Sequence, residues 1–531
     1  MELAAIVVAV LAVYWPVRHG AFVFDDLTSV VKQRKIQERQ WRGYLNWKRP
    51  LTFLSYTLTA MLCSRRNPLP PFPFHLTNMG LHVFSGFTVM WIADMCGIAP
   101  LWAGILFSVH PLAVNAVANV AGRASLLAGL FVLMSLGLLL AGHAVIAVIP
   151  FLCALASKED HVAHVLSLAG VSLWRHDPYW WAIPTVAAML GIWKWRELKG
   201  IIRNNGDSAA KMAGAQGALP FLQHVSTALT ATVYLFPQWA AGLNHTADRQ
   251  MAAIPWLSWK PMVAIGGVVS GAALIPWFPF PVQVAAVWIL LSPITLHIVI
   301  PTPDIAMEQR AYGTIAGIVL ILAWAIPAQA LLVLVVWFAT SATGHARRWI
   351  GPIPLWSWVI ESGPTERAYI NLGFALEESG RLAEAEQSYR AALQGNPRSG
   401  QAWTNLGSVY LGMNREADAI GCLEESIKLC PQYPYAYESF ARWHFHRKEW
   451  APSIRYFVQA LARLPRRHRC WNKLGLAYMH IGQIREAMDS FNQAIRYDPG
   501  EPIYRANARA ADRALGSTPS VTVPDVSLVS I

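Results

Sequence analysis

The chain has 531 residues, of which 54% are hydrophobic and only 14% are charged, and it contains 24 Trp. Soluble globular domains carry about a quarter of their residues as Asp, Glu, Lys and Arg, so much of this chain is predicted to have lipid as its solvent. The length also exceeds what one compact domain usually holds. The composition therefore excludes a single soluble domain and predicts at least two units.

The formal net charge of +12 does not indicate nucleic-acid binding, because the basic residues are scattered and no recognition motif accompanies them. In a membrane protein such a surplus is typical of contacts with anionic lipid or of the bias that sets topology. We predict membrane lipid as a partner and no nucleic acid. The 6 Cys show no Cys-x-x-Cys pair or metal-ligand spacing, which predicts free buried thiols.

Apolar runs follow one another through residues 1–350. They lie at 3–16, 76–93, 99–118, 124–142, 144–156, 161–174, 179–193, 218–241, 262–275, 283–300 and 313–340. A spanning helix needs about 20 apolar residues, so neighbouring short runs could be divided differently, and we predict about 10–13 helices. The first run lacks a basic leader and a cleavage site, which favours a retained span. The last run is long enough to be a hairpin broken near Pro327.

The longest polar interruption of this unit is the segment 18–73, interpreted as the first outer loop. It holds Asp25 and Asp26 soon after the first span, and it also contains a basic stretch and Arg49. Adjacent carboxylates at a membrane surface are suited to acid–base chemistry. The alternative is a solvated loop whose aspartates cap a helix. The pattern leaves both interpretations open.

Other polar side chains lie inside or beside the apolar runs. Such groups are costly at membrane depth and usually face a cavity or a partner, so each is a candidate site residue. They are His75, Asn78, His82, His110, Asn115, Asn119, Arg123, Lys158, Glu159, Asp160, Glu308 and Arg310. His75, Asn78 and His82 share one helical face. We interpret this face as a hydrogen-bonded seam between helices, because a metal site needs more ligands than it offers.

Two basic clusters beside predicted spans bear on topology. They are Lys194, Arg196, Lys199 and Arg203, and His345, Arg347 and Arg348. The positive-inside rule places both in the cytoplasm. The uncertain number of spans does not allow the two sides of the membrane to be assigned by counting.

The last third of the chain repeats with a period of 34 residues. The matching columns are Pro397, Pro431, Pro465 and Pro499; Leu372, Leu406, Phe440 and Leu474; Gly373, Gly407, Ala441 and Gly475; Tyr389, Leu423, Phe457 and Phe491; and Ala385, Ala419, Ser453 and Ala487. This period, with small residues where two helices meet and Pro at the boundary, is typical of tetratricopeptide repeats (TPRs). We predict four repeats and a partial capping unit over 365–516, a connector at 351–364 and a disordered tail at 517–531.

A TPR array stacks into a solenoid with an extended concave face. Asn371, Asn405 and Asn472 lie on first helices of the predicted repeats. We predict that they line this face and hold a peptide. The alternative is that the array is a spacer or a dimer surface.

Several motifs occur in a characteristic order through both halves. They are Phe22-Val-Phe-Asp-Asp26, Arg49-Pro-Leu-Thr52, Phe74-His75 with Asn78 and His82, Leu106-Phe-Ser-Val-His110-Pro111, Val120-Ala-Gly-Arg123-Ala-Ser-Leu-Leu-Ala128, Ser157-Lys158-Glu159 and Glu308-Gln-Arg310-Ala-Tyr312, followed by the TPRs. This series resembles the transmembrane-and-TPR O-mannosyltransferases and their bacterial relatives, which belong to the GT-C class of glycosyltransferases. The resemblance covers essentially the whole chain and implies an all-α fold, a polytopic GT-C-type membrane domain followed by a TPR α-solenoid.

The resemblance implies a polyprenyl-phosphate sugar as donor co-substrate, with mannose as one candidate sugar, and a protein hydroxyl as acceptor. It implies that the first outer loop carries the catalytic acid, which matches Asp25 and Asp26. The residues expected to bind the donor and its phosphate are Arg49, Arg123, Lys158, Glu159, Arg310 and Tyr312. The TPRs would select the acceptor. No cofactor is certain, and the sequence leaves a divalent cation open.

Two positions depart from the family pattern. Asn115 stands where a Glu usually follows the His-Pro, and Ser125 stands where an acidic residue commonly follows Gly-Arg-Ala. The resemblance places the TPR domain on the non-cytoplasmic side of a bacterial inner membrane, or of the endoplasmic-reticulum membrane in a eukaryote. The alternative function is a non-enzymatic membrane scaffold whose TPRs recruit partners for envelope assembly.

Overall fold

The computed structural model describes residues 1–23, 26, 30, 31, 33, 36, 38, 49–63, 69–158, 164–174, 181, 183–185, 226, 227, 230, 233, 234, 237, 238, 240–243, 259–298 and 312–516. Within these ranges every regular element is helical, so the all-α prediction is confirmed. The chain divides into two compact units, residues 1–363 and 364–531. Each unit is described by itself.

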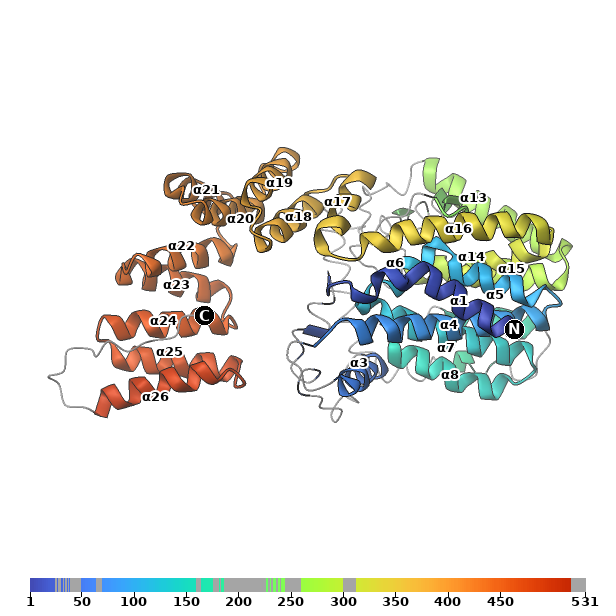
Figure 1. Cartoon of the computed structure of the whole chain (residues 1–531), viewed down its shortest axis with the longest axis horizontal. Coiled ribbons are helices and arrows are strands. Elements are labelled where there is room, and N and C mark those ends of the chain that lie inside the picture. The colour runs from blue at the N-terminus through green and yellow to red at the C-terminus, as the bar shows by residue number, and fades with distance from the viewer. Residues whose placement is uncertain are drawn as a thin grey trace. The chain divides into compact units, whose positions relative to one another are not determined.

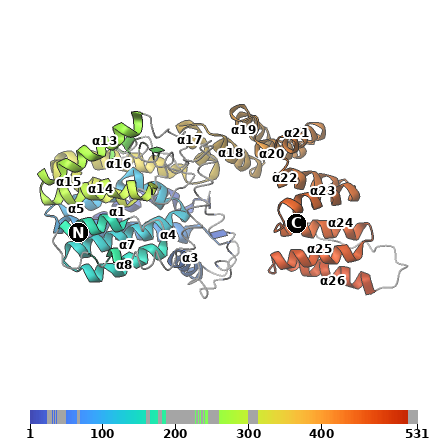
Figure 2. The same ribbon diagram turned by 180° about the vertical axis from the view of Figure 1, so that it is seen from behind.

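The first unit is a bundle of apolar helices, coloured blue to yellow in Figure 1 and seen from behind in Figure 2. Its elements are α1 (Glu2–Tyr14), η1 (Trp15–His19), α3 (Pro50–Leu62), α4 (Phe72–Met95), α5 (Pro100–Val109), η3 (Pro111–Ala113), α6 (Val114–Val117), η4 (Val120–Gly122), α7 (Arg123–Leu140), α8 (Ala144–Ser157), α9 (His164–Trp174), α13 (Trp259–Leu274), η6 (Ile275–Trp277), α14 (Phe280–Ile298), α15 (Thr314–Ala325), α16 (Ala328–Arg348) and α17 (Pro352–Ser362).

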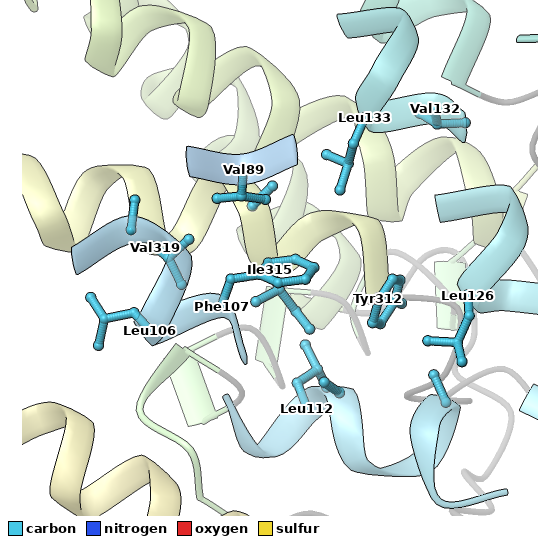
Figure 3. Packing of buried hydrophobic residues seen from close by; sticks show 14 of the residues in the cluster. Val89, Leu106, Phe107, Leu112, Leu126, Val132, Leu133, Tyr312, Ile315 and Val319 are labelled. Atoms are coloured by element: carbon cyan, nitrogen blue, oxygen red, sulfur yellow. The ribbon is translucent and has the colours of Figure 1, made fainter. Parts of the chain in front are cut away.

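The core of this unit lies where α4, α5, α7 and α15 meet. Helix α4 packs against α5 and α7, and α5 also packs against α1, α15 and α16. Figure 3 shows Phe107, Tyr312 and Ile315 pointing into the same buried cluster from α5 and the start of α15. Residues far apart in sequence therefore share one core.

Among the described residues, four helical segments are long and apolar enough to cross a membrane: Glu2–His19, Val120–Leu140, Trp259–Trp277 and Ala328–Arg348. A bent pair, Pro100–Val109 with Pro111–Val117, would make a fifth span. The chain is therefore an integral membrane protein. The count of about 10–13 helices stays a prediction, since the runs expected at 179–193 and 218–241 lie largely outside the described residues.

The spans differ in how much of their surface the bundle covers. The best window of the Val120–Leu140 span is 83% buried, whereas those of the Trp259 and Ala328 spans are 11% and 17% buried. Apolar side chains such as Val269 and Val333 are exposed on the latter two. An apolar helix with an uncovered apolar face is suited to contact with lipid. Helix α7 is thus a central element, and α13 and α16 are peripheral.

Two breaks in the apolar runs have local causes. The run expected at 99–118 bends by 52° at His110 and Pro111, because Pro has no N–H to donate and its ring clashes with the preceding turn. His110 restarts the helix by accepting from the Leu112 amide at 3.2 Å. The run expected at 313–340 is divided at Pro327, as predicted, into α15 and α16.

The segment 18–73, interpreted as the first outer loop, contains the helix α3 (Pro50–Leu62). Pro50 occupies the first turn, a position that a helix tolerates. The hydroxyls of Thr57 and Thr59 donate to the carbonyls of Phe53 and Ser55 four residues earlier. This helix is apolar but only 13 residues long, and its Ser and Thr residues interrupt the apolar run.

Over its described residues, 364–516, the second unit contains four helix pairs and one further helix. They are α18 (Glu366–Glu378) with α19 (Leu382–Gly395), α20 (Gly400–Gly412) with α21 (Glu416–Leu429), α22 (Pro434–His446) with α23 (Trp450–Arg463), α24 (His468–His480) with α25 (Ile484–Tyr497), and α26 (Pro502–Gly516). The two helices of each pair pack against each other, and each pair packs against the next. The predicted TPR fold is confirmed.

The repeated small residues are explained by the packing within each pair. A Cβ atom built on Gly475 would lie 2.6 Å from the Phe491 ring, and one on Gly373 would lie 2.6 Å from Tyr389. The large side chain of the second helix thus occupies the space above the small residue of the first. This pairing recurs at the 34-residue pitch, which is why the pattern is so regular in sequence.

Ser453, the one polar residue in its column, also has a packing role. It is fully buried, and its hydroxyl donates to the Ala441 carbonyl at 2.9 Å. A buried hydroxyl costs little when it is hydrogen-bonded. The substitution of Ser for Ala is therefore compatible with the TPR packing.

Candidate functional site

A buried carboxylate ties the first polar segment to the start of α7. Asp26 is fully buried, and its Oδ2 accepts from the Val23 amide at 3.1 Å. Its Oδ1 accepts from the Ala121 amide at 2.6 Å. Ala121 lies in η4, directly before α7, where helix N-termini favour negative charge.

Arg123, the first residue of α7, is the second member of this group and is fully buried. Its donors reach the Asn78 side-chain oxygen at 2.8 Å, the Ser55 carbonyl at 3.2 Å, the Thr59 hydroxyl at 2.9 Å and the Phe74 carbonyl at 2.8 Å, and its guanidinium lies 4.7 Å from the Tyr56 ring centroid. All of these partners are uncharged. The guanidinium is therefore held in place by uncharged acceptors of the surrounding segments.

Asn78 connects this arginine to the loop that precedes α7. Its amide donates to the Val117 carbonyl at 3.3 Å and to the Asn119 carbonyl at 2.9 Å, while its oxygen accepts from Arg123. His75, one turn earlier on α4, contacts the Gly20 carbonyl at 3.2 Å. The predicted face of His75, Asn78 and His82 is thus a polar seam between segments.

Lys158 follows the last turn of α8 and is almost fully buried. Its ammonium donates to the Ser125 hydroxyl at 3.0 Å, one turn into α7. The Thr52 hydroxyl donates to the Ser157 carbonyl at 2.7 Å, which brings the start of α3 beside the same corner. Arg49 is the N-cap residue of α3, one turn before Thr52.

The structure thus brings five residues to the N-terminal end of α7, here called the α7 cluster: Asp26, Asn78, Arg123, Ser125 and Lys158. They come from four separate segments of the chain. Ser125 has a particular consequence, because an acidic residue there would neutralise the ammonium that it now faces. Ser125 instead gives this ammonium an uncharged acceptor.

Tyr312 belongs to a neighbouring polar group. Its hydroxyl contacts His82 Nδ1 at 2.7 Å, and His82 Nε2 contacts the Ser108 carbonyl at 3.1 Å. His82 and Asn78 lie one turn apart on α4. Tyr312 is fully buried in the core, and a Cβ on Gly129 would lie 2.6 Å from its ring.

Other candidates are placed differently or lie outside the described ranges. Asp25, Glu159 and Arg310 fall outside the described residues, as do Asp160 and Glu308. The side-chain oxygen of Asn115, the other residue that differs from the expected motif, accepts from the Trp349 indole at 3.2 Å. It therefore links the segment after His110 to the end of α16.

The predicted peptide-binding residues of the TPR unit have different environments. Asn371 and Asn405 are half-buried on α18 and α20. Asn472 is buried, and its oxygen accepts from the Asn507 amide at 2.9 Å, which joins α24 to α26. The role of all three in binding an acceptor stays a prediction.

The sequence interpretation missed Ser55, Tyr56 and Thr59, which surround the Arg123 guanidinium. A signal was present, since Ser55 and Thr59 are four residues apart and so lie on one helical face. Among the residues that the structure describes, no three His, Cys, Asp or Glu side chains form a group that could hold a metal ion. A divalent cation at this site stays a prediction.

Comparisons with known proteins concern mainly the TPR unit. Residues 356–434 and 468–501 match tetratricopeptide-repeat families. Over 154 residues the chain is 29% identical to protein O-mannosyl-transferase TMTC3 of Homo sapiens, which covers 25% of this chain and 16% of that protein. Over 151 residues it is 30% identical to protein O-mannosyl-transferase TMTC4 of Homo sapiens, covering 22% of this chain and 20% of that protein.

A protein with a different name matches to a similar extent. Anaphase-promoting complex subunit 3 of Schizosaccharomyces pombe is 26% identical over 111 residues, which covers 21% of this chain and 17% of that protein. A crystal structure of MamA protein is similar with a TM-score of 0.24 and 23% identity, over 28% of this chain and 81% of that chain. The matched stretches span no more than 20% of these three curated relatives' own length. The chain is thus a membrane-associated TPR protein, related distantly to the TMTC proteins.

Proposed function

We propose that the chain is a membrane glycosyltransferase that moves a sugar from a polyprenyl phosphate to a Ser or Thr hydroxyl of a protein. One observation carries the proposal: Asp26, Arg123 and Lys158, from three separate segments, lie at the same end of α7. Burying charges is costly, and polar groups inside a membrane unit are usually functional. The order of motifs and the distant relation to protein O-mannosyl-transferases point to the same activity.

The chemistry needs a base and a stabilised leaving group. An ionised carboxylate from the Asp25–Asp26 pair takes the proton of the acceptor hydroxyl as its oxygen bonds to the anomeric carbon. The bond between that carbon and the phosphate oxygen breaks, and its electron pair leaves with the polyprenyl phosphate. The departing phosphate is a stable anion, so it needs cationic stabilisation more than protonation.

Lys158 and Arg123 have different parts in this proposal. The Lys158 ammonium donates to the Ser125 hydroxyl, and in this proposal its positive charge attracts the phosphate group of the donor. The Arg123 guanidinium already makes four hydrogen bonds to protein atoms. It would act through its charge in a medium of low dielectric constant and by fixing the geometry of the cluster. The TPR unit would hold the acceptor protein.

The experiment compares sugar transfer by Asp25→Asn, Asp26→Asn and the double variant in the full chain reconstituted in bilayers. The control is Asp94→Asn, an exposed carboxylate at the far end of α4. We expect transfer to be lost in at least one single variant and in the double variant, with normal insertion into the bilayer. Full transfer by all three variants would falsify the enzyme proposal.

A second function, a membrane scaffold, is favoured by one specific observation. Both Asp26 and Arg123 are engaged by neutral groups of the fold itself, as expected of residues that only fix the polar segment to α7. In that case the Asp26 variants change stability, no variant changes a transfer rate, and the TPR unit still binds its partners. Measuring stability and transfer on the same samples separates the two functions.

A further inference from the structure

Two grooves in the TPR unit are related by the repeat. The first has a volume of about 550 Å³ and is lined by side chains from α21, α22 and α23, among them Lys428, Tyr437, Tyr456, Arg455 and Arg463. The second has a volume of about 420 Å³ and is lined by α23, α24 and α25, among them Val458, Leu461, Trp471, Tyr478, Glu486 and Asp489. Helix α23 contributes to both grooves and forms the wall between them.

The two grooves occupy equivalent places in successive repeats. Tyr437 and Trp471, which contribute to the first and second groove, are 34 residues apart. Arg455 and Asp489 are also 34 residues apart, and each contributes to its own groove. The same position of the repeat therefore carries a positive charge in one groove and a negative charge in the next.

Three charged side chains of these grooves are open to a partner, whereas Lys428 of the first groove pairs with Glu425 at 3.0 Å and the acidic Glu424 also lines that groove. Arg455, Glu486 and Asp489 are exposed, and within the described part of the chain none of them forms an ion pair. Arg463 differs, because it is tied to the Pro431 carbonyl at 2.7 Å and lies 4.0 Å from the Tyr437 ring centroid. It helps to form the floor of the first groove.

An apolar side chain lies between the two charged rims. Val458 of α23 lines the second groove and is 46% exposed. A surface with a basic groove, an apolar wall and an acidic groove is complementary to itself. When two copies are related by a two-fold axis near α23, the basic groove of each copy faces the acidic groove of the other.

We propose that this face, formed by the two grooves and α23, binds a second copy of this chain and makes a two-fold symmetric dimer. Arg455 of each copy pairs with Asp489 of the other, and Val458 packs near the axis. The proposal is independent of the sugar-transfer activity. It rests on the equivalent positions and opposite charges of the two grooves, since opposite potentials across a contact set its register and partner choice.

The first experiment measures the mass of the full chain in detergent by light scattering, over a range of concentrations. We expect a dimer for the wild type, and at least roughly tenfold weaker association for Arg455→Glu and for Asp489→Arg, since each reversal places like charges at two contacts. The matched controls are Arg485→Glu and Asp512→Arg, which reverse exposed charges outside both grooves. The controls should associate like the wild type.

Mixing the two groove variants gives the decisive result. In a heterodimer of Arg455→Glu with Asp489→Arg, one contact pairs the new Glu with the new Arg, and the other pairs the native Asp489 with the native Arg455. Both contacts are attractive, so the mixture should dimerise although each variant alone does not. The chain carrying both changes should dimerise as well. A variant that had merely misfolded would show neither behaviour.

Several results would overturn the proposal. They are a monomeric wild type at every concentration, a dimer that Arg455→Glu leaves unchanged, and failure of the mixed variants to associate. Binding of these grooves to an unrelated acidic or basic peptide without self-association would likewise overturn it. As a positional check, Val458→Cys should form a disulfide-linked dimer under mild oxidation, in excess of that from the native thiols, and the addition of Arg455→Glu should abolish it.

Discussion

The carboxylate of Asp26 accepts a hydrogen bond from the backbone amide of Ala121, 95 residues further along the chain. This bond joins the polar segment after the first span to the start of α7, the most buried of the candidate spans. The same carboxylate is a candidate base for the proposed transfer. Asp26 is thus a candidate for both a structural role, which stability measurements test, and a chemical role, which sugar-transfer measurements test.

Replacing Asp26 with Ala should weaken the structure more around Val23 than around Ala121, the two residues whose amides donate to its carboxylate. The Val23 amide loses its carboxylate acceptor, whereas the Ala121 amide keeps the Asn119 side-chain oxygen at 3.0 Å. A typical net hydrogen bond contributes about 1 kcal/mol. We expect hydrogen exchange in peptides around Val23 to rise by roughly fivefold to tenfold, and less around Ala121. Equal increases at both ends would contradict the assigned hydrogen bonds.

Replacing Ser125 with Asp should add a negative charge to the α7 cluster. The new carboxylate would lie beside the Lys158 ammonium, which now donates to the Ser125 hydroxyl at 3.0 Å. We expect polyprenyl phosphate to bind about tenfold more weakly, which corresponds to about 1.4 kcal/mol. Ser125→Ala, which removes an uncharged acceptor, is the control and should change binding less. Tighter binding to Ser125→Asp when Mg²⁺ is added would instead indicate that the carboxylate holds a cation.

The TPR unit was predictable because its information is local in sequence. The contact of Gly475 with Phe491 spans 16 positions and recurs with the 34-residue pitch, so four repeats report the same packing. The spans were predictable for a related reason, since the apolar residues of a span are consecutive in the sequence and indicate a lipid environment. Helix α3 was missed, because Ser and Thr interrupt its apolar run. Two of its Thr hydroxyls are satisfied within the helix, which makes them compatible with a helical structure.

The α7 cluster was predictable only as a set of residue types. Motif order identified Asp26, Arg123 and Lys158 as candidates, but their partners could not be inferred. Two of the Arg123 acceptors are the backbone carbonyls of Ser55 and Phe74, which have no side-chain signature in the sequence. Contacts between segments tens of residues apart depend on how the helices pack, and the pattern of a single sequence does not record that packing.

A pH-dependent contribution to stability is expected from Glu377 at the end of α18. Burial raises the pKa of its carboxyl group, and a hydrogen bond from the Tyr389 hydroxyl offsets part of that rise. A carboxyl whose pKa is raised on folding stabilises the fold below its unfolded pKa, and this stabilisation is lost as the pH rises through the folded pKa. At neutral pH the fold therefore bears the cost of burying the charge.

Glu377→Gln should remove that cost while keeping an oxygen for Tyr389. We expect α18 and α19 in the full chain to be more protected from hydrogen exchange at neutral pH in the variant than in the wild type. The difference should shrink as the pH falls towards about 4, near the pKa of an unperturbed Glu. Comparing both proteins at each pH cancels the intrinsic pH dependence of exchange. Greater protection of the wild type at neutral pH would show that the ionised carboxylate stabilises the unit.

Two Gly→Ala substitutions in the TPR unit should have opposite effects. Both replace a glycine inside a helix, which alone favours the folded state by about 0.5–1 kcal/mol. At Gly421 of α21 a Cβ would meet nothing within 4 Å, so the full gain is expected. At Gly475 of α24 it would lie 2.6 Å from the Phe491 ring, and overpacking of this kind typically costs about 1–3 kcal/mol.

The difference between these variants isolates the contact with Phe491, since the change in helix propensity is common to both. Hydrogen exchange in the full chain should show greater protection of α21 in Gly421→Ala and lower protection of α24 and α25 in Gly475→Ala. The second variant should recover when Phe491 is also replaced by Leu, which lacks the ring that the new Cβ meets. If Gly475→Ala were as stable as Gly421→Ala, the close packing of the repeat column would not be what requires a small residue there.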